Sequence, residues 1–286
     1  MKLVPTAVAA ALLAALLLVA ACDSSSAGGE AAGPGDLKVD RFDSAAAWRL
    51  LRYQVELGPR PAGSEPSRRL ARRLRRMLPR GRFQPVPGGL RNVVGTVRGR
   101  EPGYVVVGAH YDTKDIPGFV GANDGASGTA VVTELARTIR RPRHTIHFIL
   151  FDGEESPRGS DDFYRDGLRG SRVAARRFRD ARAMVLLDFV GEKKLRIERE
   201  GYSNERLWER LQRAARQVGA GAVFPDAGQS AIQDDHLPFL EQGVPAIDLI
   251  DFDFPCFHRR CDDLSVVSER SLDAVGETVL RLLASL

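Results

Sequence analysis

The stretch that most constrains the fold is an apolar run that leads into a glycine-rich polar loop and then into a helix. Residues 104–107, YVVV, are apolar and mostly β-branched, which is typical of a buried strand. His110 and Asp112 follow its carboxyl end, and Asp124 precedes the small residues that open the helix. Ligands of open α/β sheets collect where such strands end. An imidazole and two carboxylates in one loop suit zinc, whereas the alternative is a solvated loop in which Asp124 caps the helix.

Segments with strand and helix periodicity alternate along most of the chain. The pattern predicts strands at 92–97, 104–109, 145–152, 183–189 and 246–250, and helices at 44–55, 68–78, 129–139, 167–178, 204–218 and 268–286. We expect Ser67 to cap the second helix. Such alternation is typical of a three-layer α/β fold, in which a mainly parallel sheet lies between helices. Because we find no linker that would divide this pattern, we expect one domain from residue 37 to residue 286.

The N-terminus resembles an export signal rather than part of a fold. An apolar stretch over residues 7–21 ends in VAAC, and serines follow. This pattern resembles the bacterial lipobox, in which cleavage precedes the cysteine and the cysteine carries lipid. We expect a signal peptide over 1–21, lipidation of Cys22, a flexible tether over 22–36 and a bacterial lipoprotein exported to the outer face of the cytoplasmic membrane or the periplasm. A plain secretory signal with an incidental cysteine is the alternative.

The charge is basic, with a net value of +5, and only 5 of the 42 basic residues are lysine. A basic balance can indicate nucleic-acid binding, but no nucleic-acid motif accompanies it, so we expect no nucleic-acid partner. The helix at 68–78 carries arginines opposite its leucines, at Arg68, Arg69, Arg72, Arg73, Arg75 and Arg76. This face is either solvated or suited to anionic lipid headgroups. No feature of the sequence specifies an oligomeric state.

Acidic residues also follow the later apolar runs. The predicted strand at 145–152 leads into Glu154 and Glu155, two neighbouring carboxylates that repel each other unless a cation is near. A metal would explain the pair, because one carboxylate can bind it while the other faces the substrate as a general base. The alternative is two exposed loop acids. Asp188 lies at the end of the next apolar run in the same way.

Two segments near the C-terminus carry further candidate site residues. Residues 232–236, IQDDH, contain Asp234, and His258 lies between Cys256 and Cys261. Because the protein is expected to be exported, these two cysteines are expected to form a disulfide in an oxidising compartment. The disulfide would close a small loop around His258.

Together these motifs form an ordered set that resembles the M28 family of zinc exopeptidases, which contains secreted aminopeptidases and glutaminyl cyclases. The set comprises HYD at 110–112, GANDGASG at 121–128, DGEE at 152–155, Asp188 and His258. Several stretches are more similar to glutaminyl-peptide cyclotransferases (glutaminyl cyclases) than to aminopeptidases, namely HYDTK, FVGAND, FDGEE, GSR, LLDFVG and IQDDHLPFLEQGVP. The resemblance implies a central mixed sheet flanked by helices, in agreement with the alternation.

The resemblance also implies roles for the site residues. One zinc would be held by three ligands: Asp124, Glu155 and His258. Glu154 would be the proton shuttle. The aminopeptidases of the family carry a second zinc on His110 and Asp188, whereas the cyclases use one zinc and keep these two residues as hydrogen-bonding groups. Asp234 matches the acid that the cyclases use alongside the shuttle.

We therefore expect a zinc enzyme that acts on peptide N-termini and converts N-terminal glutaminyl residues to pyroglutamyl residues with release of ammonia. The alternative is an M28 aminopeptidase, and a third reading is a binding lipoprotein without catalysis. Animal cyclases have a tryptophan at the position of Phe257 and a histidine at that of Asp248. The CFHRRC loop is more similar to secreted bacterial aminopeptidases. These departures concern the pocket rather than the chemistry, because Glu154 and every implied ligand are present.

Overall fold

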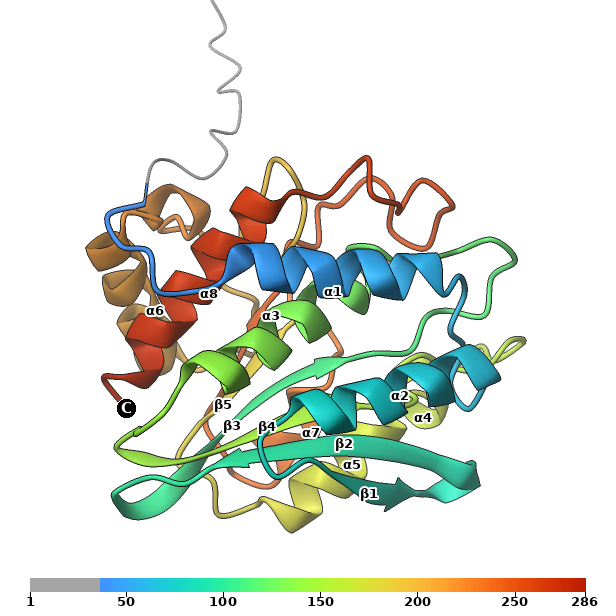
Figure 1. The fold of residues 1–286 in the computed structure, drawn as a ribbon, viewed down its shortest axis with the longest axis horizontal. Coiled ribbons are helices and arrows are strands. Elements are labelled where there is room, and N and C mark those ends of the chain that lie inside the picture. Colours follow the sequence, from blue (N-terminus) through green and yellow to red (C-terminus); the bar gives the residue numbers. More distant parts are fainter. Residues whose placement is uncertain (1–36) are drawn as a thin grey trace, which may run out of the picture. The chain divides into compact units, whose positions relative to one another are not determined.

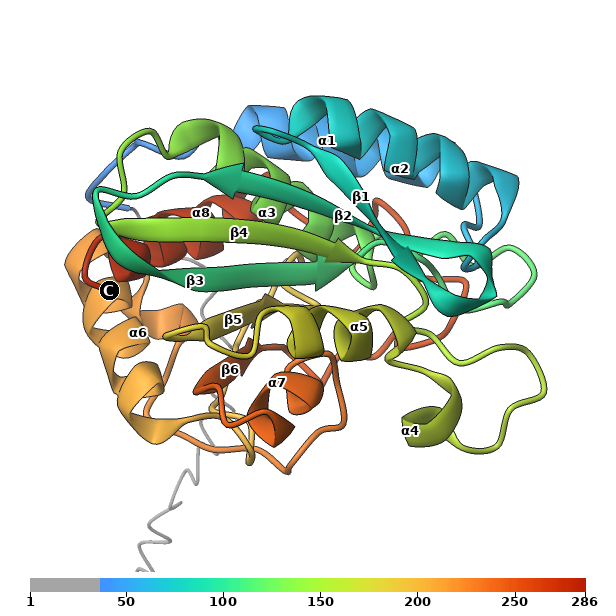
Figure 2. The same ribbon diagram turned by 90° about the horizontal axis from the view of Figure 1, so that it is seen from below.

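The computed structural model describes residues 37–286, within which six strands form one sheet (Figures 1 and 2). The strands are β1 (Arg82–Val86), β2 (Leu90–Val97), β3 (Glu101–His110), β4 (His144–Phe151), β5 (Met184–Leu187) and β6 (Ala246–Leu249). Their order is β1-β2-β4-β3-β5-β6. The four strands β4, β3, β5 and β6 are parallel, and β1 and β2 are antiparallel to their neighbours. The mixed, mainly parallel sheet confirms the predicted fold class.

Helices cover both faces of the sheet (Figure 2). One face packs against α1 (Ser44–Glu56), α2 (Glu65–Met77), α3 (Ala126–Thr138), α6 (Glu205–Val218) and α8 (Glu269–Leu283). The other packs against α5 (Arg169–Arg177) and α7 (Leu237–Glu241). The remaining short elements are α4 (Phe163–Asp166) and the 3₁₀ turns η1 (Pro87–Gly89) and η2 (Gly221–Val223).

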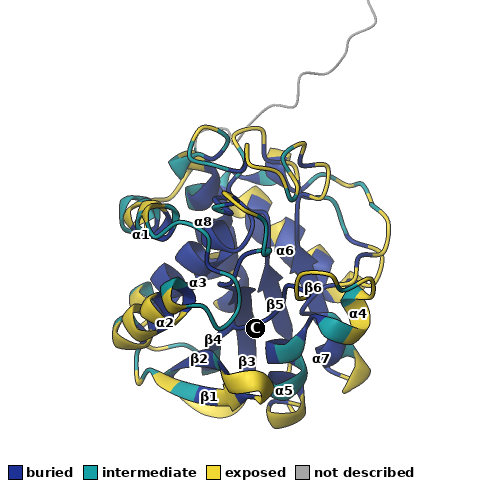
Figure 3. Cartoon of the chain, turned by 90° about the vertical axis from the view of Figure 1, so that its right-hand side faces the viewer, coloured by how far each residue is buried: buried dark blue, intermediate teal, exposed yellow. Residues whose placement is uncertain are grey.

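The two cores follow from the alternation of side chains along each strand. On β3, Val105 and Val107 face the larger helical layer, whereas Val106 faces α5 and α7. All three are buried, which is why the run reads as continuously apolar in the sequence. Figure 3 shows the central strands buried, and β1 and the outer surfaces of α2 and α5 largely exposed. The described residues belong to one compact unit that contains these cores.

Two local features differ from the predictions. Ser64 rather than Ser67 caps α2, which begins three residues earlier with a proline in its first turn. Strand β1 was not predicted, because it is a short strand at the sheet edge interrupted by Pro85. The predicted strands and helices are present with shifted ends, and the short helices α4 and α7 were not predicted.

The expected signal peptide, Cys22 and the tether lie outside the described residues. Between residues 37 and 286 we find no helix with the length and apolar character that a membrane crossing requires.

The sheet topology creates one edge where site residues gather. Strand β3 has β4 on one side and β5 on the other, so the connections that follow β3 and β4 diverge there. The carboxyl ends of the four parallel strands share this edge, which we call the carboxyl edge. Such a switch in strand order leaves a crevice at which open α/β sheets bind ligands.

Candidate metal centre

The carboxyl edge brings together the five ligand residues named from the sequence. His110 is the last residue of β3, Glu155 follows β4, Asp188 follows β5, and His258 lies in the loop after β6. Two groups have ligand atoms within 4.8 Å of one another: the first comprises His110, Asp124 and Asp188, and the second comprises Asp124, Glu155 and His258. Asp124 belongs to both.

Asp124 lies between the two histidines. Its Oδ1 is 3.2 Å from His110 Nε2, and its Oδ2 is 3.5 Å from His258 Nε2. Glu155 Oε1 is 3.0 Å from His258 Nε2, and Asp188 Oδ1 is 3.2 Å from His110 Nε2. All of these side chains except His258 are almost fully buried. The geometry therefore permits one shared carboxylate to bridge two positions.

The donor set fits a zinc ion. Asp124 Oδ2 is buried without a hydrogen-bond partner, which is costly for a carboxylate. Burial and the charge of Glu155 raise the pKa of Asp124 to about 6. A divalent cation would satisfy this oxygen and offset the repulsion, and two carboxylates with one imidazole are ligands that zinc accepts.

The loop that carries Asp124 is held from behind. Asp262 accepts hydrogen bonds from the backbone N–H groups of Asn123 (2.7 Å) and Asp124 (3.0 Å). Gly125 has φ +84°, and a Cβ atom there would lie 2.6 Å from the carbonyl oxygen of Asp112, so only glycine fits. The backbone thus fixes the Asp124 carboxylate before any ion binds.

Arg60 supports the same loop, and sequence reasoning missed it. Its guanidinium is fully buried and donates to the carbonyl oxygens of Gln54 (2.8 Å), Val120 (2.8 Å) and Gly121 (3.2 Å). Burial lowers its pKa to about 10, although the nearby charge of Asp262 opposes this. The only sequence signal was a single arginine between two prolines, and it does not reveal these distant partners.

A backbone break directs Glu154 and Glu155 into the same cavity. Strand β4 ends at Phe151, and Gly153 then adopts φ +74°, so the two neighbours do not alternate as they would in a strand. Asp112 fixes the turn by accepting from the N–H groups of Glu154 and Glu155, both at 3.3 Å.

The two glutamates have opposite electrostatic environments. Burial, and then the charge of Glu155, raises the pKa of Glu154 well above its ordinary value. Burial would also raise the pKa of Glu155, but the hydrogen bond with His258 and the charges of His258 and Lys114 hold it below its ordinary value. Lys114 Nζ lies 3.1 Å from Glu155 Oε2. Glu155 is thus suited to bind a cation as an anion, and Glu154 to carry a proton.

The cavity above the ligands has a volume of about 570 Å³. Its polar lining includes Asp124, Glu154, Glu155, Asp188, Asp234 and His258. Its apolar lining includes Phe163, Phe189, Ile232, Ile250, Phe252 and Phe257. Phe252 and Phe257 remain 43% and 38% exposed, and Phe257 stacks on His258 with ring centroids 3.9 Å apart. The cavity therefore combines carboxylates with apolar and aromatic side chains.

Behind Asp234 lies a second buried polar cluster. His236 is fully buried and lies 3.1 Å from Glu200 and 3.7 Å from Asp248, so it belongs to neither ligand group. Burial together with the charge of Asp234 raises the pKa of Asp248 well above its ordinary value. The raised pKa favours the protonated form of Asp248.

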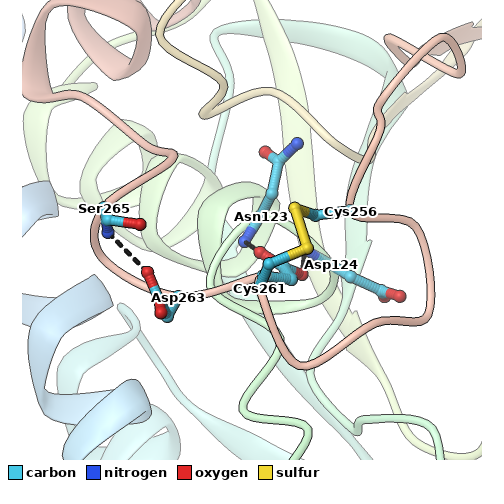
Figure 4. Close-up of a disulfide and its surroundings, with 7 residues drawn as sticks. Asn123, Asp124, Cys256, Cys261, Asp263 and Ser265 are labelled. Carbon is cyan, nitrogen blue, oxygen red and sulfur yellow. Dashed lines mark hydrogen bonds between the residues drawn. A yellow bond between two sulfur atoms is a disulfide. The ribbon is translucent and has the colours of Figure 1, made fainter.

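A disulfide between Cys256 and Cys261 closes the loop that carries His258, with Cα atoms 5.5 Å apart. Figure 4 shows this disulfide beside Asn123 and Asp124. His258 has φ +52°, a backbone conformation that a histidine rarely adopts, so the surrounding loop imposes it.

Comparison with known proteins agrees with this geometry. The profile of "Peptidase family M28" matches residues 92–283, which is 192 of the 286 residues. The chain belongs to peptidase family M28. This confirms the resemblance drawn from the motifs.

The curated relatives of this M28 chain have both activities in their names. A glutaminyl-peptide cyclotransferase of Drosophila melanogaster is 27% identical over 70% of this chain, and aminopeptidase YwaD of Bacillus subtilis is 30% identical over 63% of it. The matched regions span 66% and 40% of these relatives' own lengths.

Solved structures of the fold divide in the same way. A glutaminyl cyclase of Porphyromonas gingivalis is similar with a TM-score of 0.76 and 29% identity, covering 86% of this chain and 99% of that one. A leucine aminopeptidase precursor of Bacteroides thetaiotaomicron has a TM-score of 0.78 and 27% identity, and the match covers 88% of this chain and 100% of that one. A Zn-dependent exopeptidase of Parabacteroides distasonis has a TM-score of 0.77 and 26% identity, and the match covers 87% of this chain and 100% of that one.

Proposed function

We propose that this M28 protein is a zinc-dependent glutaminyl-peptide cyclotransferase that converts N-terminal glutaminyl residues of peptides to pyroglutamyl residues. The observation that carries the proposal is that Glu154 and Asp234 open into the same cavity as the group formed by Asp124, Glu155 and His258. The cyclases among the relatives and solved structures support it, and the Zn-dependent exopeptidase structure supports the choice of zinc.

In the proposed reaction the α-amino nitrogen of the substrate attacks its own γ-carboxamide carbon, and the bond from that carbon to the amide nitrogen breaks. Zinc held by the three ligands would supply a Lewis acid that polarises the γ-carbonyl group. Glu154 accepts the proton of the attacking amine and donates it to the leaving nitrogen, which departs as ammonia. Asp234 lines the same cavity. Burial and the charge of Glu155 have the larger effects on the pKa of Glu154, and the charge of Asp234 raises it further.

One observation favours an aminopeptidase as the second candidate. His110, Asp124 and Asp188 form another group with metal-ligand spacing. With both groups occupied, Glu154 would instead accept a proton from the water that attacks the first peptide carbonyl.

The deciding experiment incubates zinc-loaded protein with a glutaminyl amide and a leucyl amide, separates pyroglutamyl amide from free amino acids, and counts bound zinc. The cyclase proposal expects pyroglutamyl amide and ammonia from the glutaminyl amide, whereas free leucine with two zinc ions per chain would establish the aminopeptidase. If neither product forms although zinc is bound, the result would favour a binding protein without catalysis.

Substitutions at the two neighbouring glutamates test their roles. Glu154→Gln should keep zinc bound and reduce turnover by about 10²–10⁴-fold, because it removes the proton carrier. Glu155→Gln should weaken zinc binding, because a neutral amide replaces an anionic ligand. Zinc content and activity are measured for both, with Glu209→Gln on the exposed side of α6 as the control. Normal activity in Glu154→Gln would eliminate it as the shuttle in both reactions.

A further inference from the structure

The edge of the sheet opposite the metal centre is lined by exposed arginines. The turn between β2 and β3 and the loop between α3 and β4 lie at the amino ends of the parallel strands β3 and β4. We call the arginines there, together with Arg80 after α2 and Arg41 before α1, the basic edge: Arg41, Arg80, Arg98, Arg100, Arg140, Arg141 and Arg143. The last turn of α2, with Arg75 and Arg76, leads into it.

The basic edge is one continuous surface with two hollows. The first, of about 290 Å³, is lined by Arg80, Arg98 and Arg140. The second, of about 310 Å³, is lined by the remaining arginines of the edge and again by Arg140. Since Arg140 lines both hollows, they adjoin.

These charges have almost no internal counterions. Arg143 forms an ion pair with Glu101 at 2.7 Å. Across the described part of the chain, the other six arginines of the basic edge have no carboxylate within ion-pair distance, whereas Arg72, Arg158 and others on the surface do. A cluster of like charges repels itself, so an external anionic surface would stabilise it.

The lining of the larger hollow distinguishes among anionic partners. Ile139 is partly exposed among the arginines, whereas Ile146, Leu280 and Leu283 are almost fully buried beneath them. A soluble polyanion would gain nothing from the exposed part of Ile139. A phospholipid headgroup region presents phosphate together with apolar glycerol and acyl groups, so both parts of the hollow would be matched.

The described chain also begins at this edge. The backbone N–H of Lys38 donates to the carbonyl oxygen of Val218 (2.8 Å), and that of Arg41 donates to Glu277. Arg41 itself lines the larger hollow. Residues 22–36 precede the described residues at this point of the chain. If Cys22 carries a lipid, as we propose, the anchor therefore attaches at the side of the basic edge.

We propose that the basic edge docks on a membrane surface rich in anionic phospholipids, such as phosphatidylglycerol. Because the metal centre lies at the carboxyl edge, docking would direct the 570 Å³ cavity away from the membrane. Peptide N-termini could then enter it from solution. The orientation follows from the sheet topology and holds for either proposed reaction.

The test measures binding of the soluble unit, residues 37–286, to vesicles by sedimentation. Residues 37–286 are used because the described unit contains both hydrophobic cores. We expect binding to vesicles containing about half phosphatidylglycerol at about 0.05 M salt, and loss of binding at about 0.5 M salt, where charges are screened within a few ångströms. Vesicles of phosphatidylcholine alone should not bind it.

Two triple variants with equal charge changes locate the surface. The edge variant combines Arg98→Gln, Arg140→Gln and Arg141→Gln, and should lower the partition coefficient by about 10²-fold, because each arginine near an anionic surface contributes about a fivefold factor. The control variant combines Arg68→Gln, Arg69→Gln and Arg158→Gln, which are exposed but lie away from the basic edge, and should change it by less than about threefold. Both should keep the wild-type melting temperature.

Three results would overturn the proposal. They are equal binding to neutral and anionic vesicles, an equal loss in the control variant, and binding to soluble polyphosphate without binding to vesicles.

Discussion

Replacing Arg60 by methionine would remove the buried cation that supports the metal-binding loop. The methionine fills a similar volume but donates no hydrogen bond. It would leave unpaired the carbonyl oxygens of Gln54, Val120 and Gly121, and would remove a positive charge that acts on Asp262. We expect the Arg60→Met protein to be less stable and to bind zinc more weakly.

The magnitude follows from burial. Each buried acceptor left without a partner costs about 1–3 kcal/mol, and removing one partner of a buried ionic network costs about 3–5 kcal/mol in total. We therefore expect Arg60→Met to lower the free energy of unfolding by about 3–5 kcal/mol, a large share of the stability of an ordinary domain. Arg60→Lys keeps the charge but lacks the planar guanidinium with its several donors, so it should lower the free energy of unfolding by a smaller amount.

The assay combines urea unfolding with zinc titration against a chelating dye. Val120 and Gly121 lie a few residues before Asp124, so release of their carbonyl groups should loosen that ligand. Loss of a group that supports a metal ligand commonly weakens metal affinity by about 10–100-fold. Arg206→Met on the exposed face of α6 serves as the control and should change neither quantity.

The reasoning is refuted if Arg60→Met unfolds at the same urea concentration as the Arg206→Met control. Unchanged zinc affinity in a destabilised Arg60→Met protein would refute only the link to the metal loop. If Arg60→Met does not fold, zinc affinity is compared in Arg60→Lys, where the same loss of carbonyl contacts is expected in milder form.

Three further perturbations have definite expected outcomes. Burial, and then the charge of Glu277, raises the pKa of Asp273 to about 6, so the charged form destabilises the fold and stability falls as pH rises from about 4 to about 6. Asp273→Asn should therefore be more stable than wild type by about 1 kcal/mol at pH 7, after allowance for its half-exposed position, and equal to it at pH 4, as urea unfolding at both pH values would show. Replacing Cys256 and Cys261 by serine should lower the free energy of unfolding by about 2 kcal/mol relative to the oxidised wild type, because the disulfide closes a short loop. Relative to the reduced wild type, the difference should vanish. Chelation should abolish turnover and lower the melting temperature by about 10 °C, since zinc at about 1,000 times its dissociation constant contributes about 4 kcal/mol; an unchanged melting temperature would contradict a bound metal.

The sequence by itself determined the layered fold and the positions of the main site residues. Strands β3, β4 and β5 are short apolar runs, and an acidic or imidazole side chain follows each one closely. These signals are local, because the period of a strand and the polarity of the next residues are both written in a few consecutive positions. Once the strands are parallel, their carboxyl ends must share an edge, so His110, Asp124 and Asp188 converge without further information.

Only the tertiary structure decided which distant groups hold that site in place. Arg60 contacts carbonyl groups about sixty residues further along the chain, and Asp262 binds the backbone of Asn123 and Asp124 from the opposite end of the sequence. The burial of His236 with Glu200 has the same origin. No periodicity encodes such pairs, because they are selected by packing and by the need of buried polar groups for partners, and both arise only when the chain is folded.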